Sequence, residues 1–301
     1  MELWALITIA AAFLQNVRSM MQKYLKGAMG TTGATFVRFG FGLPFVVLYL
    51  ALTLHFTGYA LPALNAGFML WALIGGTTQI AATFLLVHLF SFRNFAVGTA
   101  YSRTEPAQAA LFALVLFGET ISAGAVLAIA ISVVGVMLIS VARIDFSWRA
   151  MVVSTFSRTA LIGLASGALF GVSSVTYRAA SLSLGGPHFA VQAATTLAFV
   201  IIVQTVAMLA WIVWKEREEL VRIRKAWKPS LLVGIAGASA SFGWFSAMTL
   251  QQAAVVKALA QVEMLFAFAT TIFFFKERVN RFEFLGCALI VFGILVLARF
   301  G

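Results

Sequence analysis

The chain alternates between long apolar runs and short polar stretches along its whole length. Each run has about 20 residues, and a helix of that length crosses a hydrocarbon core of roughly 30 Å. Because backbone groups surrounded by lipid must bond within their own segment, we predict that the runs are helices. We therefore expect an all-α membrane protein with ten transmembrane helices, at residues 3–22, 33–54, 68–90, 96–117, 122–142, 159–180, 188–213, 231–250, 254–275 and 282–300.

The composition supports a lipid environment. Of the 301 residues, 62% are hydrophobic and 10% are charged, and the mean hydropathy is +0.99. Soluble domains carry about 25% charged residues. The first run has no basic stretch before it and no small-residue cleavage pattern after it, so we expect a retained span rather than a signal peptide. The single cysteine, Cys287, rules out an internal disulfide framework, and we predict no metal site and no cofactor.

One stretch of charged and apolar residues occurs twice. Residues 101–120 read YSRTEPAQAALFALVLFGET, and residues 259–278 read LAQVEMLFAFATTIFFFKER. A shift of 158 residues places Glu105 on Glu263 and Glu119 on Glu277, so a pair of carboxylates returns with the same 14-residue gap. Carboxylates are rare in so apolar a chain, and this match therefore indicates an internal duplication.

The duplication divides the chain into a first repeat at residues 1–142 and a second at residues 159–301, each with five predicted helices. An odd number of spans forces the second repeat to insert upside down relative to the first. Inverted-topology repeats are a common plan of secondary transporters, with the substrate site near the bilayer midplane between the repeats. We therefore predict two inverted five-helix repeats.

The basic residues predict an orientation in the membrane. The net charge is +11, and fifteen of the basic residues lie in the loops after the first, third, fifth, seventh and ninth spans. Positive-inside counting places these loops in the cytoplasm and both termini outside. This distribution disfavours a nucleic-acid partner.

The largest basic cluster is at residues 215–228. We interpret it either as an amphipathic helix on anionic lipid, with Leu220, Ile223 and Trp227 on one side, or as a solvated loop.

Several charged residues lie within the spans, where a buried charge costs at least about 2.5–3.5 kcal/mol. Glu105 and Glu263 are about nine residues into their spans and so near mid-depth. They could line a polar cavity that holds a charged substrate or relays protons, or they could form ion pairs that only lock the helices together. Lys257 has Thr99 as its counterpart, and a symmetric scaffold does not need this asymmetric charge, so it favours function.

From these residues and their polar neighbours we predict a substrate site. The candidates are Arg38, His88, Tyr101, Arg103, Glu105, Trp244, Lys257, Gln261 and Glu263, with Arg18 and Gln79 nearby in the apolar runs. Pro106 and Pro44 are expected to break their helices. Glycines 163, 167 and 171 predict close helix packing. Glu119 and Glu277 are expected to interact with the N-termini of the helices that follow them.

The duplicated stretch resembles a known family. Glu105-Pro106 followed by Phe117-Gly118-Glu119, and Glu263 followed by Phe275-Lys276-Glu277, are similar to the EamA-type pattern of the drug/metabolite transporter superfamily. Arg38-Phe39 is similar to the Arg-Phe position of that family. The resemblance implies a ten-helix carrier of small polar metabolites, often an exporter, with a cavity lined mainly by the first, third, fourth, sixth, eighth and ninth helices.

The chain departs from the family pattern in two respects. Met264 stands where the second copy would have a proline, so only the first repeat keeps the Glu-Pro pair. Familiar members are also expected to keep both ends in the cytoplasm, whereas the loop charges predict the reverse. An inverted repeat tolerates either orientation, and we follow the charges.

Three functions were compared with the sequence. The leading hypothesis is a secondary transporter of amino-acid-like or other charged or zwitterionic metabolites in a bacterial inner membrane. An enzyme is disfavoured because the chain has no H-E-x-x-H pair, no G-x-S-x-G turn and no aspartate within a span, Asp145 being the only one. A channel or a structural membrane partner remains the alternative, and no nucleotide-binding G-x-x-x-x-G-K-[ST] loop is present.

Overall fold

All the regular secondary structure that the computed structural model describes is helical, over residues 2–92, 101–141, 158–186, 188–273 and 281–300. In the first repeat the helices are α1 (Leu3–Leu25), α2 (Thr31–Gly40), α3 (Leu43–Thr57), α4 (Ala66–Leu89), α6 (Glu105–Phe117) and α7 (Ala123–Val141). In the second repeat they are α9 (Arg158–Ser183), α10 (Phe189–Lys215), α11 (Glu218–Lys225), α12 (Trp227–Leu250), α13 (Ala253–Leu259), α14 (Val262–Phe273) and α15 (Arg281–Phe300).

Seven helical segments are long and apolar enough to cross a membrane. They are α1, residues 31–57 (α2 with α3), α4, α9, α10, α12 and α15, and α6 and α7 are shorter apolar helices. Parts of the predicted spans 96–117 and 254–275 lie outside the described residues. An all-helical membrane fold is therefore confirmed, and the count of ten spans stays a prediction.

The predicted span at residues 33–54 consists of two helices. α2 ends at Gly40 and α3 begins at Leu43, with Pro44 in its first turn. The break expected at Pro44 is therefore confirmed. Its physical reason is that proline cannot donate a backbone hydrogen bond to the preceding turn. The break leaves Arg38 in the last turn of α2.

The fourth and ninth spans are interrupted at positions that differ by one residue in the 158-residue register. In the first repeat, the amide of Thr104 donates to the carbonyl of Tyr101 just before α6. In the second repeat, the amide of Gln261 donates to the carbonyl of Ala258 between α13 and α14. Both are tighter i→i−3 bonds than those of an α-helix. Since only the first repeat has a proline here, the interruption does not depend on Pro106.

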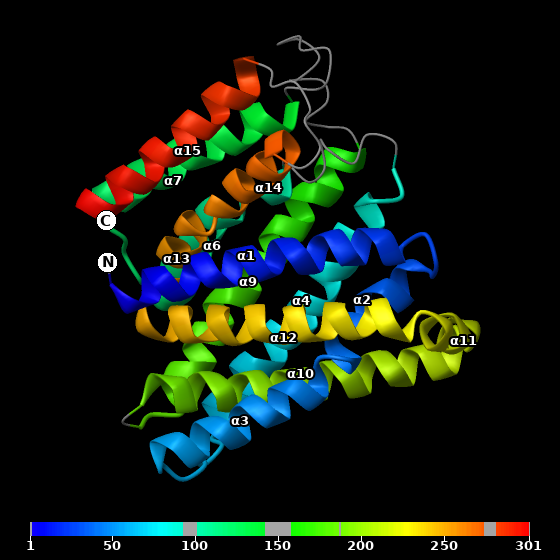
Figure 1. Cartoon of the computed structure of the whole chain (residues 1–301). Coiled ribbons are helices and arrows are strands. Elements are labelled where there is room, and N and C mark those ends of the chain that lie inside the picture. Colours follow the sequence, from blue (N-terminus) through cyan, green and yellow to red (C-terminus); the bar gives the residue numbers. More distant parts are fainter. Residues whose placement is uncertain (1, 93–100, 142–157, 187, 274–280, 301) are drawn as a thin grey trace.

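The long helices pack in pairs that join the repeats. In Figure 1, α1 lies along α12, α4 along α9, and α7 along α15. In the repeat, α1 is equivalent to α9, α4 to α12 and α7 to α15. The pairs α1–α12 and α4–α9 are therefore equivalent to each other, and the pair α7–α15 is equivalent to itself. The third pair is antiparallel, because Gly124 at the start of α7 lies against Phe300 at the end of α15, while Gly135 lies against Gly286. Inversion of the second repeat requires this direction.

Glycines allow the closest helix approaches. A Cβ atom at Gly135 would lie 2.7 Å from the carbonyl oxygen of Gly286, and one at Gly167 would lie 2.8 Å from that of Ser102. Gly171 packs in the same way against the backbone of Ala109. The contacts at Gly135 and Gly167 leave no room for a side chain, and the contact at Gly171 is tight. The packing role predicted for the α9 glycines is therefore confirmed at residues 167 and 171.

The basic segment at residues 215–228 is docked onto the first repeat. Glu219 is buried and accepts a hydrogen bond from the backbone amide of Gly30 at 2.8 Å. Leu220 and Ile223 pack into the apolar core, whereas Trp227 is exposed. The apolar side of α11 is thus largely covered by protein, and lipid contact through the exposed basic residues stays a prediction.

Candidate functional site

A polar cavity of about 330 Å³ lies between the helices of the two repeats. Residues from α1, α4, α9, α12, α13, α14 and the turn before α6 line it, and these belong to the six spans that the family resemblance implied. α2 adds Arg38, so the cavity has one more contributing span than expected. The helix interruptions described above place Arg103, Glu105 and Glu263 at its wall.

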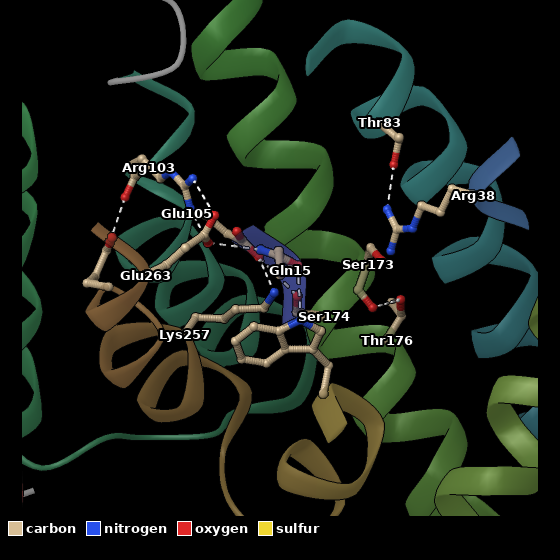
Figure 2. A network of polar contacts seen from close by, with 12 residues as sticks. Gln15, Arg38, Thr83, Arg103, Glu105, Ser173, Ser174, Thr176, Lys257 and Glu263 are labelled. Atoms are coloured by element: carbon tan, nitrogen blue, oxygen red, sulfur yellow. Dashed lines mark hydrogen bonds and ion pairs between the residues drawn. The ribbon is translucent and has the colours of Figure 1, made fainter. Parts of the chain in front are cut away.

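The first ion pair of the cavity joins Arg103 to Glu263 (Figure 2). The two guanidinium Nη atoms of Arg103 lie 2.7 and 3.0 Å from the two carboxylate oxygens of Glu263, which is the bidentate geometry that arginine favours. Gln15 of α1 donates a further hydrogen bond to Glu263 at 3.2 Å. Gln261 donates to the backbone carbonyl of Arg103 at 3.0 Å. Glu263 is 2% exposed, so this arrangement satisfies a carboxylate that is almost fully buried.

The second ion pair joins Lys257 to Glu105 with 3.0 Å between Nζ and Oε1. Ser174 of α9 donates to the same carboxylate oxygen at 3.2 Å. The Lys257 ammonium lies 4.7 Å from the ring centre of Trp244, a cation–π contact. The Trp244 indole in turn donates to Gln15 at 2.9 Å, so the two ion pairs belong to one network.

Both ion pairs join one repeat to the other. The carboxylates Glu105 and Glu263 are equivalent by the 158-residue shift, but their cations are not, because Arg103 corresponds to Gln261 and Lys257 to Thr99. The site is therefore a symmetric pair of carboxylates with an asymmetric pair of cations. Since these groups would cost much to bury alone, each half of the molecule stabilises a charge of the other.

A separate ion pair connects the end of α6 to α9 and α12. Arg178 Nε lies 3.5 Å from Glu119 Oε1, and the Arg178 guanidinium also donates to the carbonyls of Met248 and Gln251 at the end of α12. The interaction expected between Glu119 and the N-terminus of the next helix stays a prediction. Ser122 accepts the hydrogen bond from the Ala125 amide at the start of α7, while Glu119 binds Arg178. Its repeat counterpart, Glu277, lies outside the described residues.

A comparison with family models agrees with this arrangement. The model of the EamA-like transporter family matches residues 2–141 and again residues 157–299. The chain belongs to the EamA-like transporter family. The resemblance deduced from the duplicated stretch is confirmed, and this EamA-like protein is a multi-pass membrane transporter of small molecules built from two repeats.

A solved structure shares the EamA-like fold found here. A crystal structure with 19% sequence identity matches with a TM-score of 0.71 and covers 98% of this chain and 97% of that chain. Identity this low supports the fold alone. No curated protein matches the sequence.

The site of the EamA-like protein brings together most of the predicted residues. Arg38, Arg103, Glu105, Trp244, Lys257 and Glu263 all line the cavity. Gln261 lines a small adjoining pocket with Gln15 and both carboxylates. Tyr101 is buried but does not line the cavity. His88 of α4 does not line it either, and packs between the rings of Phe84 and Phe92.

Two residues that the sequence analysis did not select are part of the network. Gln15 joins the ion pairs, and Ser174 binds Glu105. The sequence did contain a sign that Gln15 faces a polar site, because Gln15, Arg18 and Gln22 recur at the spacing of one helix face within an apolar run. Ser174 gave no comparable signal, since serines are frequent in that span.

Proposed function

We propose that this protein is a secondary transporter that carries small polar metabolites by alternating access and uses the cavity as its substrate site. The observation that carries the proposal is the pair of ion pairs, Arg103–Glu263 and Lys257–Glu105, which connect the repeats across a polar cavity. A site between two repeats can open to either side when the repeats change their packing.

The ion pairs supply a route for coupling binding to rearrangement. A charged substrate could replace one partner of a pair, because a carboxylate or ammonium of the substrate offers the same charge. Substrate binding would then release one repeat from the other and favour a different packing of the two. Glu105 could also take up a proton when Lys257 turns to the substrate, which would couple transport to protons.

The inverted relation of the repeats supports the same mechanism. The antiparallel contact of α7 with α15, seen at Gly135 and Gly286, is the one expected when the second repeat is upside down. Amino-acid-like, zwitterionic substrates fit a cavity that presents both signs of charge. We further propose export from the cytoplasm as the direction, the bacterial inner membrane as the location, and anionic lipid as a partner of residues 215–228.

The experiment that tests this function is a flux measurement after a binding screen. Purified protein is screened by thermal shift against a metabolite panel, and the stabilising compound is followed in proteoliposomes. A carrier gives a flux that saturates with substrate and is accelerated by unlabelled substrate on the opposite side. A flux that rises linearly with concentration would support a channel instead, and the absence of any flux would leave a structural membrane partner.

A further inference from the structure

Two arginines of the cavity are buried and have no carboxylate partner within the described part of the chain. Arg18 and Arg38 are each 3% exposed, and each has a buried Nε atom with no hydrogen-bond acceptor. Arg38 donates to the hydroxyl of Thr83 at 2.9 Å, and Arg18 makes a long bond of 3.4 Å to Ser19. Within the described residues, no carboxylate lies at ion-pair distance from either guanidinium.

This situation is unlike that of the other cations in the site. Arg103 and Lys257 have Glu263 and Glu105, respectively, at 2.7 and 3.0 Å. A buried cation without a counter-charge is costly, and arginine cannot lose its proton to avoid the cost. A guanidinium has five donors in a planar fork, so the described part of the chain leaves most of the donors of Arg18 and Arg38 unused.

The two side chains meet at one place in the cavity although they come from different helices. Arg18 is on α1 and Arg38 on α2, and both line the cavity. A Cβ atom at Gly237 of α12 would lie 3.4 Å from Arg18 Cδ and 3.4 Å from Arg38 Cγ, so both stems flank the same glycine. Figure 2 shows Arg38 on the α4 side of the site, across α9 from the Arg103–Glu263 pair.

The charge of the cavity lining points to the sign of the missing partner. Among the described residues that line it, five side chains are cationic (Arg18, Lys23, Arg38, Arg103 and Lys257) and two are carboxylates (Glu105 and Glu263). The excess is positive, and the two carboxylates are already bound to cations. An anion from outside the protein would therefore satisfy the arginines without disturbing either ion pair.

We propose that Arg18 and Arg38 form an anion subsite that binds the carboxylate or phosphate group of a small organic acid. Arginine recognises both groups through two parallel hydrogen bonds, which is the reason to expect this chemistry rather than a halide site. The inference rests on the proposed function where it names the cargo as an acid. Binding of the anion is a separate claim that can be tested without transport.

The test uses the purified full-length protein and paired probes that differ in charge. Succinate is compared with succinamide, and glycerol 3-phosphate with glycerol, by thermal shift and by direct titration. The subsite predicts that at least one anionic probe stabilises the protein while its neutral counterpart does not. The pair that responds distinguishes a carboxylate site from a phosphate site, and equal effects of charged and neutral probes would overturn the proposal.

Variants separate an anion subsite from a structural role. Arg18→Gln and Arg38→Gln should each weaken binding of the responding anion about tenfold or more, a loss of roughly 1.4 kcal/mol or more. Arg224→Gln, which changes an exposed arginine on α11, is the matched control and should bind as the wild type does. Because Arg18 is a buried cation with no ion pair among the described residues, Arg18→Gln should leave the melting temperature of the ligand-free protein unchanged or raise it.

The opposite pattern contradicts the subsite. If Arg18→Gln lowers the ligand-free melting temperature and leaves the anion-induced shift intact, the arginine is structural. Anion binding that depends on both arginines, in a protein without saturable flux, would support the subsite and reject the proposed transport. Saturable flux of a neutral or cationic metabolite that is unaffected by both variants would keep transport and reject the subsite.

Discussion

Arg103 in the first repeat binds Glu263 in the second through both guanidinium nitrogens, at 2.7 and 3.0 Å. Arg103 and Glu105 therefore do not pair with each other, although they are two residues apart in the sequence. Each instead binds a partner in the opposite repeat, so the charges at the head of this apolar segment connect the two halves of the molecule.

Removal of Arg103 should destabilise the protein through Glu263. Breaking a fully buried ion pair by removing one partner costs about 3–5 kcal/mol, because the remaining charge stays buried. The Arg103 side chain is 30% exposed, so we expect a smaller loss here, caused by the buried Glu263. Arg103→Gln should therefore lower the melting temperature, measured by thermal unfolding in detergent. The double variant Arg103→Gln with Glu263→Gln should recover most of the loss, since no buried charge is left alone. A double variant whose loss equals the sum of the single losses would contradict this relationship.

Glu105→Gln should separate function from stability. The amide keeps the shape of the carboxylate and can still bind Ser174, so we expect the protein to fold. Transport per folded molecule should fall or change its pH dependence, because the charge that holds Lys257 and could accept a proton is gone. Flux and melting temperature are measured on the same preparation. A lower melting temperature with unchanged transport would show that Glu105 has a structural role and does not take part in transport.

Lys257→Ala should weaken the binding of an acidic substrate by at least about tenfold, the equivalent of one charge-assisted hydrogen bond. Among the described residues, the variant also leaves the Glu105 carboxylate with the Ser174 hydroxyl as its remaining partner in the network. Titration of the substrate found in the screen gives the result directly. Ser174→Ala is the matched control, because it removes a neutral contact to the same carboxylate. Equal losses in the two variants would show that the charge of Lys257 is not what binds substrate.

Two glycine substitutions test the packing of the repeats. Gly135→Ala would place a methyl group 2.7 Å from the Gly286 carbonyl, and such overpacking typically costs about 1–3 kcal/mol. Gly76→Ala is the control, since the nearest side-chain atoms would be 3.8 Å away and alanine favours the helix by about 1 kcal/mol. Thermal unfolding should therefore show a loss for the first variant and no loss for the second. Equal stability of both variants would contradict the close α7–α15 contact.

The orientation predicted from the loop charges can be tested by labelling intact cells. In a Cys287→Ser background, one cysteine replaces Lys225 on α11 and another, in a separate variant, replaces the exposed Ala60 between α3 and α4. Positive-inside counting predicts that an impermeant thiol reagent labels residue 60 and spares residue 225. The reverse pattern would restore the orientation of familiar members and show that the charges mislead here.

The sequence predicted the helical membrane fold, the two-repeat organisation and most of the charged cavity residues, because hydropathy and a repeated pair of carboxylates depend on sequence order alone. It did not predict which cation binds which carboxylate. That choice depends on how the turn before α6 and the start of α6 lie against α13 and the start of α14, and helical spacing within one segment carries no such information. The ninth-span interruption was missed as well, since it occurs at residues 260–261 without a proline. Its signal was only the likeness to the first repeat, where Pro106 marks the corresponding break in the sequence.

The central claim is that the repeats alternate around the cavity, and a reversible cross-link tests it most directly. Gln252 of the second repeat donates to the carbonyl of Thr120 in the first at 3.1 Å, next to the Glu119–Arg178 pair. Cysteines at these two positions, in a Cys287→Ser background, can be joined by a short reducible linker. The measurement is substrate exchange in proteoliposomes before linking, after linking and after reduction. Alternating access predicts that linking abolishes exchange and that reduction restores it, whereas exchange that continues with the linker in place would contradict the account.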